Sequence, residues 1–384
     1  MVTRTDVEYL ADLTLDIRDM TQAMAKDGGS KEALEIYVDG LNSEQTVGRK
    51  FKLMQLSTDL NSMEITKATP SYLFHLFGLS DRSIDLNRLA ERGLYADNYV
   101  RNAIISNDAL APKAALILNM WMYAAHLLYD GVMTCQKKLE ADNPSQFDLK
   151  GGGLDEFIAL WIGTGQNPGS LGGYGLYALA EEADQLFDAG ADEDLDFGDG
   201  TFVESFVNYH IKLLYQEGAT LLSLDGVCTK ENPESAKRLW SVVSRILSQM
   251  KIPLLQMLIN SVLEEDKEAT MLYANAVVPQ ASQCRASTYK RLKTYLMTDN
   301  PRFDKIEVIL RDLYDIFSCF GLTCYDVGDI FNPGQYKIEI PDCIAAENNA
   351  PMALYQPSSG VLPVSFEEGR YSCFAPISNN RVGL

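Results

Sequence analysis

The chain is poor in histidine and in positive charge. It has three histidines, His75, His126 and His210, among 384 residues, and this scarcity excludes a histidine-rich metal centre. Its 33 basic residues stand against 53 acidic ones, a formal net charge of −20. An acidic surface of this kind repels phosphate backbones and anionic lipids, so we expect no nucleic acid partner. The acidity is compatible with capture of a metal ion, and its simpler meaning is solubility.

The sequence also lacks an apolar run long enough to cross a bilayer comfortably. The longest run, near Ala114–Tyr129, is interrupted by Asn119 and His126. The first twenty residues carry acids from Asp6 onward and contain no apolar stretch of signal-peptide length. We therefore expect neither a transmembrane segment nor a targeting sequence in this chain. Two locations remain open: an intracellular compartment, or the cell surface, periplasm or exterior after removal of a leader.

Familiar catalytic motifs are missing as well. There is no GxSxG, no P-loop and no HExxH sequence. The glycine-rich stretches that begin at Gly151 and Gly163 lack the preceding strand and the lysine of a phosphate-binding loop, so we predict loops between helices there. The sequence thus predicts a protein that is not an enzyme.

Cysteine is present, but not in the paired CxxC spacing of zinc sites. Five of the seven cysteines lie in the last third of the chain. This distribution favours disulfides over a metal cluster, leaves the pairing open, and leaves at least one free thiol if the others pair. The sequence has no Asn-x-Ser/Thr site for N-glycosylation, a feature that would have supported secretion. The cysteines are Cys135, Cys228, Cys284, Cys319, Cys324, Cys343 and Cys373.

What the sequence does contain is helical periodicity. Apolar residues recur at three- and four-residue spacing up to about Gly328, which predicts an all-α fold. From Ile330 the segments become short, β-branched and interrupted by proline and glycine, which predicts an irregular, partly extended tail over 330–384. The predicted helices after the first are Lys31–Leu41, Leu86–Ser106, Ala111–Lys138, Leu154–Ile162, Gly173–Phe187, Thr201–Gln216, Glu234–Leu263, Lys267–Val278, Ala286–Thr298 and Phe303–Phe320.

The chain contains a candidate internal repeat. Leu116–Asp130 aligns without a gap on Ile246–Asn260, and five apolar positions and three polar positions of the first segment fall on residues of the same kind in the second. We therefore predict two related helical-bundle halves, residues 1–187 and 201–329, joined by an acidic linker at 188–200. Chance similarity between apolar helices is the competing interpretation.

The linker region is a candidate calcium site. An EF-hand loop needs oxygen ligands at positions 1, 3 and 5, glycine at 6 and a bidentate glutamate at 12. Here both the glycine, Gly198, and the glutamate arrive one position late. A solvated linker is the favoured alternative, because connectors between helical halves are commonly acidic. The candidate Ca2+ ligands are Asp192, Asp194, Asp196, Asp199 and Glu204.

Two helix faces carry ligands that suit ferric iron. Tyr123, His126 and Asp130 lie at three- and four-residue spacing, so they share one face with a phenol, an imidazole and a carboxylate. Tyr177 and Glu181 form a second such face. The alternatives are a core histidine bonded to Asp130 or to a backbone carbonyl, and tyrosines that serve packing.

Four segments resemble the algal iron-assimilation proteins, a family that includes diatom phytotransferrins and the high-CO2-inducible periplasmic proteins of green algae. They are LYALAEEAD from Leu176, QMKIPLLQMLINSV from Gln249, LYANAVVPQASQC from Leu272 and GLTCYDVGDI from Gly321. The resemblance covers about Leu154–Ile330. It implies an extracytoplasmic protein that captures Fe3+ at the algal cell surface, with carbonate as synergistic anion.

The sequence therefore leads to two hypotheses about function. The preferred one is a non-catalytic ferric-iron-binding protein whose partner is the metal ion. The alternative is a structural or interaction protein of the cell envelope or of an internal compartment, with Ca2+ in the acidic loop.

Overall fold

The protein folds as an all-α molecule, as the sequence predicts. The computed structural model describes residues 6–46, 48–57, 95–141, 143, 153–167, 170, 172–188, 204–282 and 284–330. In these ranges the strands form two short antiparallel pairs: β1 (Glu44–Thr46) with β2 (Arg49–Lys50), and β3 (Phe187–Asp188) with β4 (Asp329–Ile330). The remaining regular elements are helices.

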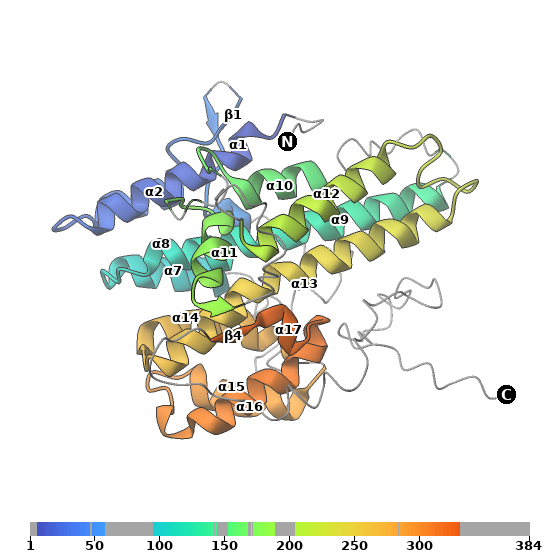
Figure 1. Ribbon diagram of the computed structural model, residues 1–384. Coiled ribbons are helices and arrows are strands. Elements are labelled where there is room, and N and C mark those ends of the chain that lie inside the picture. Colours follow the sequence, from blue (N-terminus) through green and yellow to red (C-terminus); the bar gives the residue numbers. More distant parts are fainter. Residues whose placement is uncertain are drawn as a thin grey trace, which may run out of the picture.

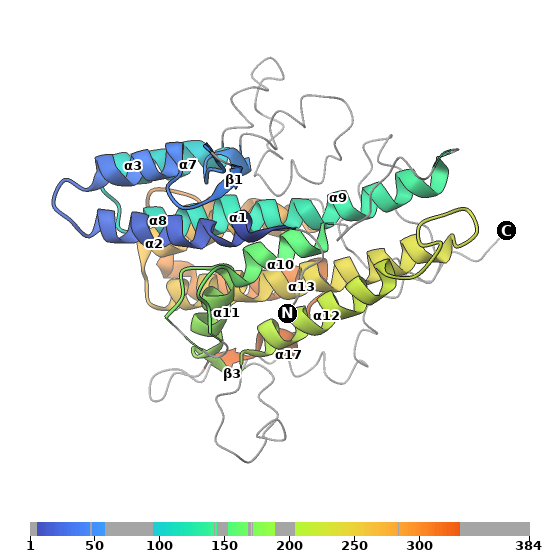
Figure 2. The ribbon, with the colours of Figure 1, turned by 90° about the horizontal axis from the view of Figure 1, so that it is seen from above.

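Two long helices, α9 (Trp121–Glu140) and α13 (Glu234–Leu263), form the centre of the molecule. They lie side by side and run in opposite directions (Figures 1 and 2). The indole Nε1 of Trp121 donates a hydrogen bond to the Met250 carbonyl over 2.8 Å, which fixes their register. Around this pair pack α10 (Leu154–Ile162), α11 (Leu176–Asp184), α12 (Phe206–Leu222) and α14 (Lys267–Val277).

Helix α13 owes its length to a sequence that is apolar on several faces. It is the one helix in the described part of the chain that is long and apolar enough to cross a membrane, and 83% of its apolar window is buried inside the molecule. Burial against α9, α12 and α14 accounts for this composition, because a helix that is hydrophobic all round is a core helix in a large protein.

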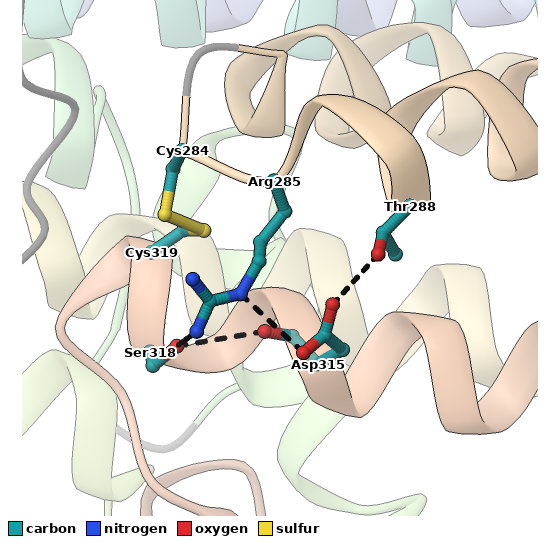
Figure 3. Close-up of a disulfide and its surroundings, with 6 residues drawn as sticks. All are labelled: Cys284, Arg285, Thr288, Asp315, Ser318 and Cys319. Atoms are coloured by element: carbon teal, nitrogen blue, oxygen red, sulfur yellow. Dashed lines mark hydrogen bonds and ion pairs between the residues drawn. A yellow bond between two sulfur atoms is a disulfide. The ribbon is translucent and has the colours of Figure 1, made fainter.

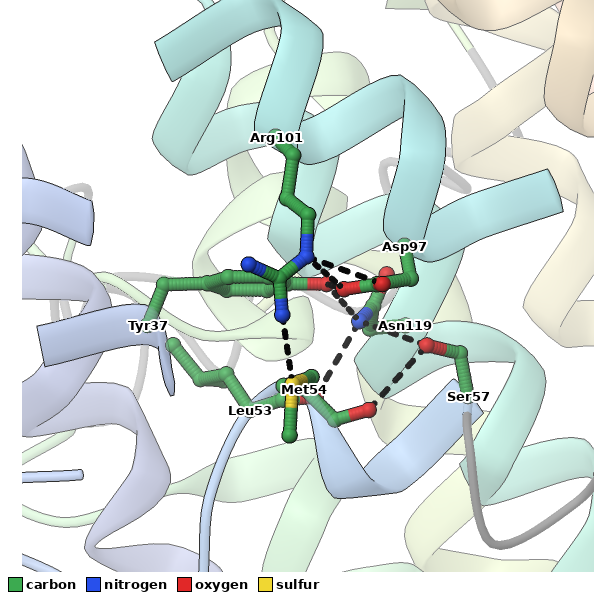
Figure 4. A network of polar contacts seen from close by, with 7 residues as sticks. All are labelled: Tyr37, Leu53, Met54, Ser57, Asp97, Arg101 and Asn119. Atoms are coloured by element: carbon green, nitrogen blue, oxygen red, sulfur yellow. Dashed lines mark hydrogen bonds and ion pairs between the residues drawn. The ribbon is translucent and has the colours of Figure 1, made fainter. Parts of the chain in front are cut away.

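The N-terminal helices pack at one end of this centre. They are α1 (Glu8–Ala11), α2 (Leu13–Met24), α3 (Ser30–Asp39), α7 (Tyr95–Ile105) and α8 (Ala111–Ala114). A buried polar network joins them to the core (Figure 4). The Tyr37 hydroxyl donates to Asp97 over 3.0 Å, and the Asn119 amide donates to the Tyr37 oxygen over 2.9 Å. Arg101 completes the network with a 2.9 Å ion pair to Asp97.

The residues Ala111–Lys138, predicted as one helix, contain a change of winding. Ala115–Met120 forms a π-helix, η2, between α8 and α9. A π-turn takes more residues per turn than an α-helix and so shifts the faces of the residues that follow. Asn119 lies in η2 and donates hydrogen bonds to Tyr37, to the Leu53 carbonyl and to Ser57.

The C-terminal helices follow α14, and α15 and α16 lie below it in Figure 1. They are η5 (Val278–Ala281), α15 (Ala286–Leu296), η6 (Phe303–Lys305), α16 (Ile306–Phe317), η7 (Ser318–Phe320) and α17 (Cys324–Val327). The predicted disulfides are confirmed here and in the centre. Cys284 pairs with Cys319 and Cys135 with Cys228, and Cys324 is disulfide-bonded as well. In the chain-entropy model the two loops, of 35 and 93 residues, stabilise the fold by about 4 and about 5 kcal/mol.

The predicted duplication is not settled by this arrangement. Its two segments lie in η2 and α9 on one side and in α13 on the other, and these helices pack against each other. The halves 1–187 and 201–329 stay a prediction. The linker 188–200, apart from Asp188 in β3, and the tail 331–384 lie outside the described residues.

Candidate metal centre

The candidate centre lies where the first turn of α10 meets the middle of α9. Gly153, the residue before α10, has φ +77°. A Cβ atom at this position would stand 2.1 Å from the Leu127 carbonyl oxygen of α9. Because glycine alone permits so close an approach at a positive φ, it brings Glu156, in the first turn of α10, toward residues 127–131 of α9.

His126 is the buried member of the centre. It is 7% exposed, and its Nδ1 atom has no hydrogen-bond partner in the described structure. Burial lowers the pKa of the imidazole, and the charge of Asp130 partly opposes this effect. The ring is therefore neutral at pH 7, with a nitrogen available to accept a proton or to bind a metal. The alternative of a core histidine bonded to Asp130 or to a backbone carbonyl does not account for the Nδ1 atom, which has no such bond.

Tyr123 and Asp130 flank His126 on α9 and lead outward to the surface. The ring centroid of Tyr123 lies 5.9 Å from that of His126 and 6.1 Å from that of Phe51. Tyr9 of α1 continues this row, with its ring edge-on to Phe51 at 5.5 Å. Asp130 is exposed and makes no ion pair with any described residue. The structure thus keeps the three predicted residues on one face of one helix.

Glu156 and Tyr9 belong to the same neighbourhood and were missed by the sequence reasoning. Glu156 is half-buried, and its pKa is raised by burial and by the charges of Asp130 and Asp155. Burial and the charge of Glu156 raise the pKa of Tyr9 in turn. Asp155 is itself occupied, because it accepts a 2.7 Å hydrogen bond from Tyr215. The available signal was the acid placed three residues after the last glycine of the GGG stretch, at the start of a helix.

Tyr177 and Glu181, the second predicted face, hold the start of α12. The Glu181 carboxylate is 5% exposed and accepts hydrogen bonds from the Ser205 amide over 3.1 Å and from Asn208 Nδ2 over 2.7 Å. Asn208 Nδ2 also donates to the Tyr177 carbonyl, and Asn208 Oδ1 accepts from Trp161. These donors occupy the carboxylate, so it serves as an anchor for the helix and leaves little capacity for a metal.

Of the five predicted calcium ligands, the structure describes Glu204. Its Oε2 forms an ion pair with Lys212 of α12, and its Oε1 is buried without a hydrogen-bond partner. Asp192, Asp194, Asp196 and Asp199 lie outside the described residues.

The acidic, histidine and cysteine side chains of the described residues do not form a complete metal-coordination sphere by themselves. In the described ranges, no three of these side chains converge closely enough to hold a metal ion. No family model, curated protein or solved structure matches this chain. What α1, α9 and α10 place in one neighbourhood, without closing a coordination sphere, is the imidazole of His126, the carboxylates of Asp130 and Glu156 and the phenols of Tyr9 and Tyr123. This donor set suits a hard cation, with Asp130 at the solvent side and His126 at the buried side.

Proposed function

We propose that this protein binds ferric iron at the junction of α9 and α10 and catalyses no reaction. The observation that carries the proposal is the buried Nδ1 atom of His126, which has no hydrogen-bond partner and lies one helical turn from both Tyr123 and Asp130. A buried polar atom without a partner costs free energy, and such atoms are uncommon in folded proteins. A bound cation would supply the missing partner.

Charge supports the same proposal. Burial raises the pKa of Glu156, and the charges of Asp130 and Asp155 raise it further. Neither Asp130 nor Glu156 forms an ion pair with a described residue. A trivalent cation would remove this repulsion and would draw Glu156 of α10 toward Asp130 of α9. Carboxylate and phenol oxygens are hard donors, and imidazole is a common ligand of iron.

An extracytoplasmic location is part of the proposal. The disulfides Cys135–Cys228 and Cys284–Cys319 suit an oxidising compartment, because such bonds are rare where glutathione keeps thiols reduced. This agrees with the resemblance to the algal iron-assimilation proteins. Carbonate is the small anion that we propose for the coordination positions that the side chains leave open.

The test is a titration of the full chain with a weak ferric chelate in bicarbonate buffer. We expect a visible absorption band from phenolate-to-iron charge transfer. Tyr123→Phe should weaken or abolish the band, and His126→Gln should lower the affinity by about tenfold or more, the usual effect of losing one metal ligand or its support.

Matched controls are available on α12. Tyr209 is exposed, His210 is half-buried, and the His210 ring lies against the rings of Phe206 and Tyr209. Tyr209→Phe and His210→Gln should bind iron as the unaltered protein does. A colourless titration of the unaltered chain would contradict the proposal and leave the structural role as the better description.

That structural role is the second candidate, with a specific observation of its own. Glu204 keeps one buried carboxylate oxygen without a partner at the end of the acidic loop. A Ca2+ ion bound there would make the loop a structural element of an envelope or compartment protein.

A further inference from the structure

We propose that the Cys284–Cys319 disulfide is a thiol-exchange site, which an external dithiol opens while Cys135–Cys228 stays closed. The two bonds differ in access. Cys135 and Cys228 are both fully buried, at 0% exposure. Cys284 is half-buried at the surface, whereas its partner Cys319 is 1% exposed. Cys284 is therefore the more accessible end of this bond for an attacking thiolate.

A guanidinium group lies beside this bond. Arg285 follows Cys284 directly, and its terminal nitrogen donates to the hydroxyl of Ser318, the neighbour of Cys319, over 3.3 Å (Figure 3). A positive charge on the residues that adjoin the two cysteines favours an approaching thiolate and a departing one. The 11-residue helix α15 begins at Ala286, and its positive N-terminal end adds to this effect.

The carboxylate nearest to Arg285 is held in place. Asp315 lies 3.4 Å from Arg285 Nε and accepts a 2.7 Å hydrogen bond from Thr288. Asp315 thereby orients the guanidinium, and its carboxylate interacts with both Arg285 and Thr288. Arg285 is 43% exposed, so its charge is also available to an incoming anion.

The exchange balances with a dithiol as reductant. The thiolate of the dithiol attacks the Cys284 sulfur, forms a mixed disulfide and releases Cys319 as a thiolate, which takes up a proton. The second thiol of the dithiol then loses its proton and attacks the first sulfur of the same dithiol, which is bonded to Cys284. This attack releases Cys284 as a thiolate, which is then protonated. In sum, the protein disulfide gains two electrons and two protons, and the dithiol is oxidised to a disulfide.

Reduction of the Cys284–Cys319 bond removes one of several contacts that hold the C-terminal helices together. The bond ties the start of α15 to η7, just after α16. Helices α15 and α16 stay joined by the 2.6 Å ion pair of Arg291 with Asp312 and by the Thr288–Asp315 hydrogen bond. The segment after Cys319 remains bound to α13, because Ser248 donates to the Phe320 carbonyl over 2.7 Å. Reduction should therefore be reversible.

The experiment exposes the full native chain to graded ratios of reduced and oxidised dithiothreitol near neutral pH. Free thiols are then alkylated and located by mass mapping. We expect Cys284 and Cys319 to become alkylated at least about tenfold faster than Cys135 and Cys228, because access limits exchange at buried sulfurs. Equal rates for the two bonds, or faster opening of Cys135–Cys228, would overturn the proposal.

A variant pair tests the part played by charge. Arg285→Gln should slow the exchange by about threefold to tenfold while the unfolding midpoint stays nearly unchanged. Arg302→Gln is the matched control, because Arg302 pairs with Asp304 in the same group of helices. Equal rates for the two variants would show that Arg285 does not assist the exchange. None of these measurements depends on iron binding, so they stand or fall separately from the proposed function.

Discussion

At the scale of single residues, the fold assigns different tasks to side chains of the same type. His126 keeps a buried nitrogen without a partner, whereas His210 lies against the rings of Phe206 and Tyr209, with centroid distances of 3.8 Å and 5.9 Å. Glu181 is saturated by hydrogen bonds, whereas Glu156 faces the charge of Asp130. Residue type alone therefore does not identify the site, because burial and partners decide what each group can do.

His210 gives a residue-scale prediction about pH. Burial lowers the pKa of its imidazole, with Asp326 partly opposing this shift. Below the ordinary pKa of about 6.5 the unfolded chain therefore binds more protons at this position than the folded one, and the free energy of unfolding falls as the pH drops. Urea unfolding at pH 7.5, 6.5 and 5.5 should show a shallower loss of stability for His210→Gln than for the unaltered chain. Parallel curves would contradict this assignment.

The candidate site could be predicted in part. The spacing of Tyr123, His126 and Asp130 placed them on one helix face, and the structure has them there. The spacing on this helix face could not reveal Glu156 and Tyr9, since they reach the neighbourhood through the contacts of α10 with α9 and with α1, although the GGG stretch before Glu156 was a local signal for the first of them. The second predicted face, Tyr177 and Glu181, stays a prediction, and local spacing did not reveal that Glu181 accepts hydrogen bonds from residues 24 and 27 positions later in the chain.

At the scale of helices and strands, periodicity predicted well where packing follows it. The bounds of α10 and α13 agree with the prediction at both ends. The predicted helical run Ala111–Lys138 is confirmed as α8, η2 and α9, but periodicity did not predict the π-turn in η2, where Asn119 makes tertiary hydrogen bonds to residues 37, 53 and 57. A local sequence pattern contains no information on partners so distant along the chain.

The contact between α10 and α9 gives a prediction at this scale. Gly153→Ala places a methyl group 2.1 Å from the Leu127 carbonyl at a positive φ. The strain should destabilise the protein by at least about 2 kcal/mol and should weaken ferric binding, since Glu156 would move away from α9. Denaturant unfolding and the ferric titration measure the two effects.

Gly165→Ala is the control for backbone strain alone. Gly165 has a φ of +76°, and no described atom lies within 4 Å of the place that a methyl group would take there. Its substitution should cost only about 1 kcal/mol and leave iron binding unchanged. Equal losses of stability at the two glycines would contradict the assigned contact.

At the scale of the whole molecule, the charge of −20 raises the question of whether calcium organises the acidic loop. Glu204, the candidate bidentate ligand, has one oxygen in an ion pair with Lys212. We therefore expect thermal unfolding of the full chain in calcium and in a calcium chelator to give the same midpoint. A ligand bound by the folded state alone must raise the midpoint, so an upward shift in calcium would favour the structural role.

The Cys135–Cys228 bond also determines how the molecule responds to being cut. It closes the chain between its two cysteines into a covalent ring, which includes α10, α11 and α12 as well as the acidic stretch between α11 and α12. One proteolytic cleavage anywhere inside this ring leaves both fragments attached to each other. A nicked molecule would keep its full mass until a reductant reaches a bond that the fold buries on both sides.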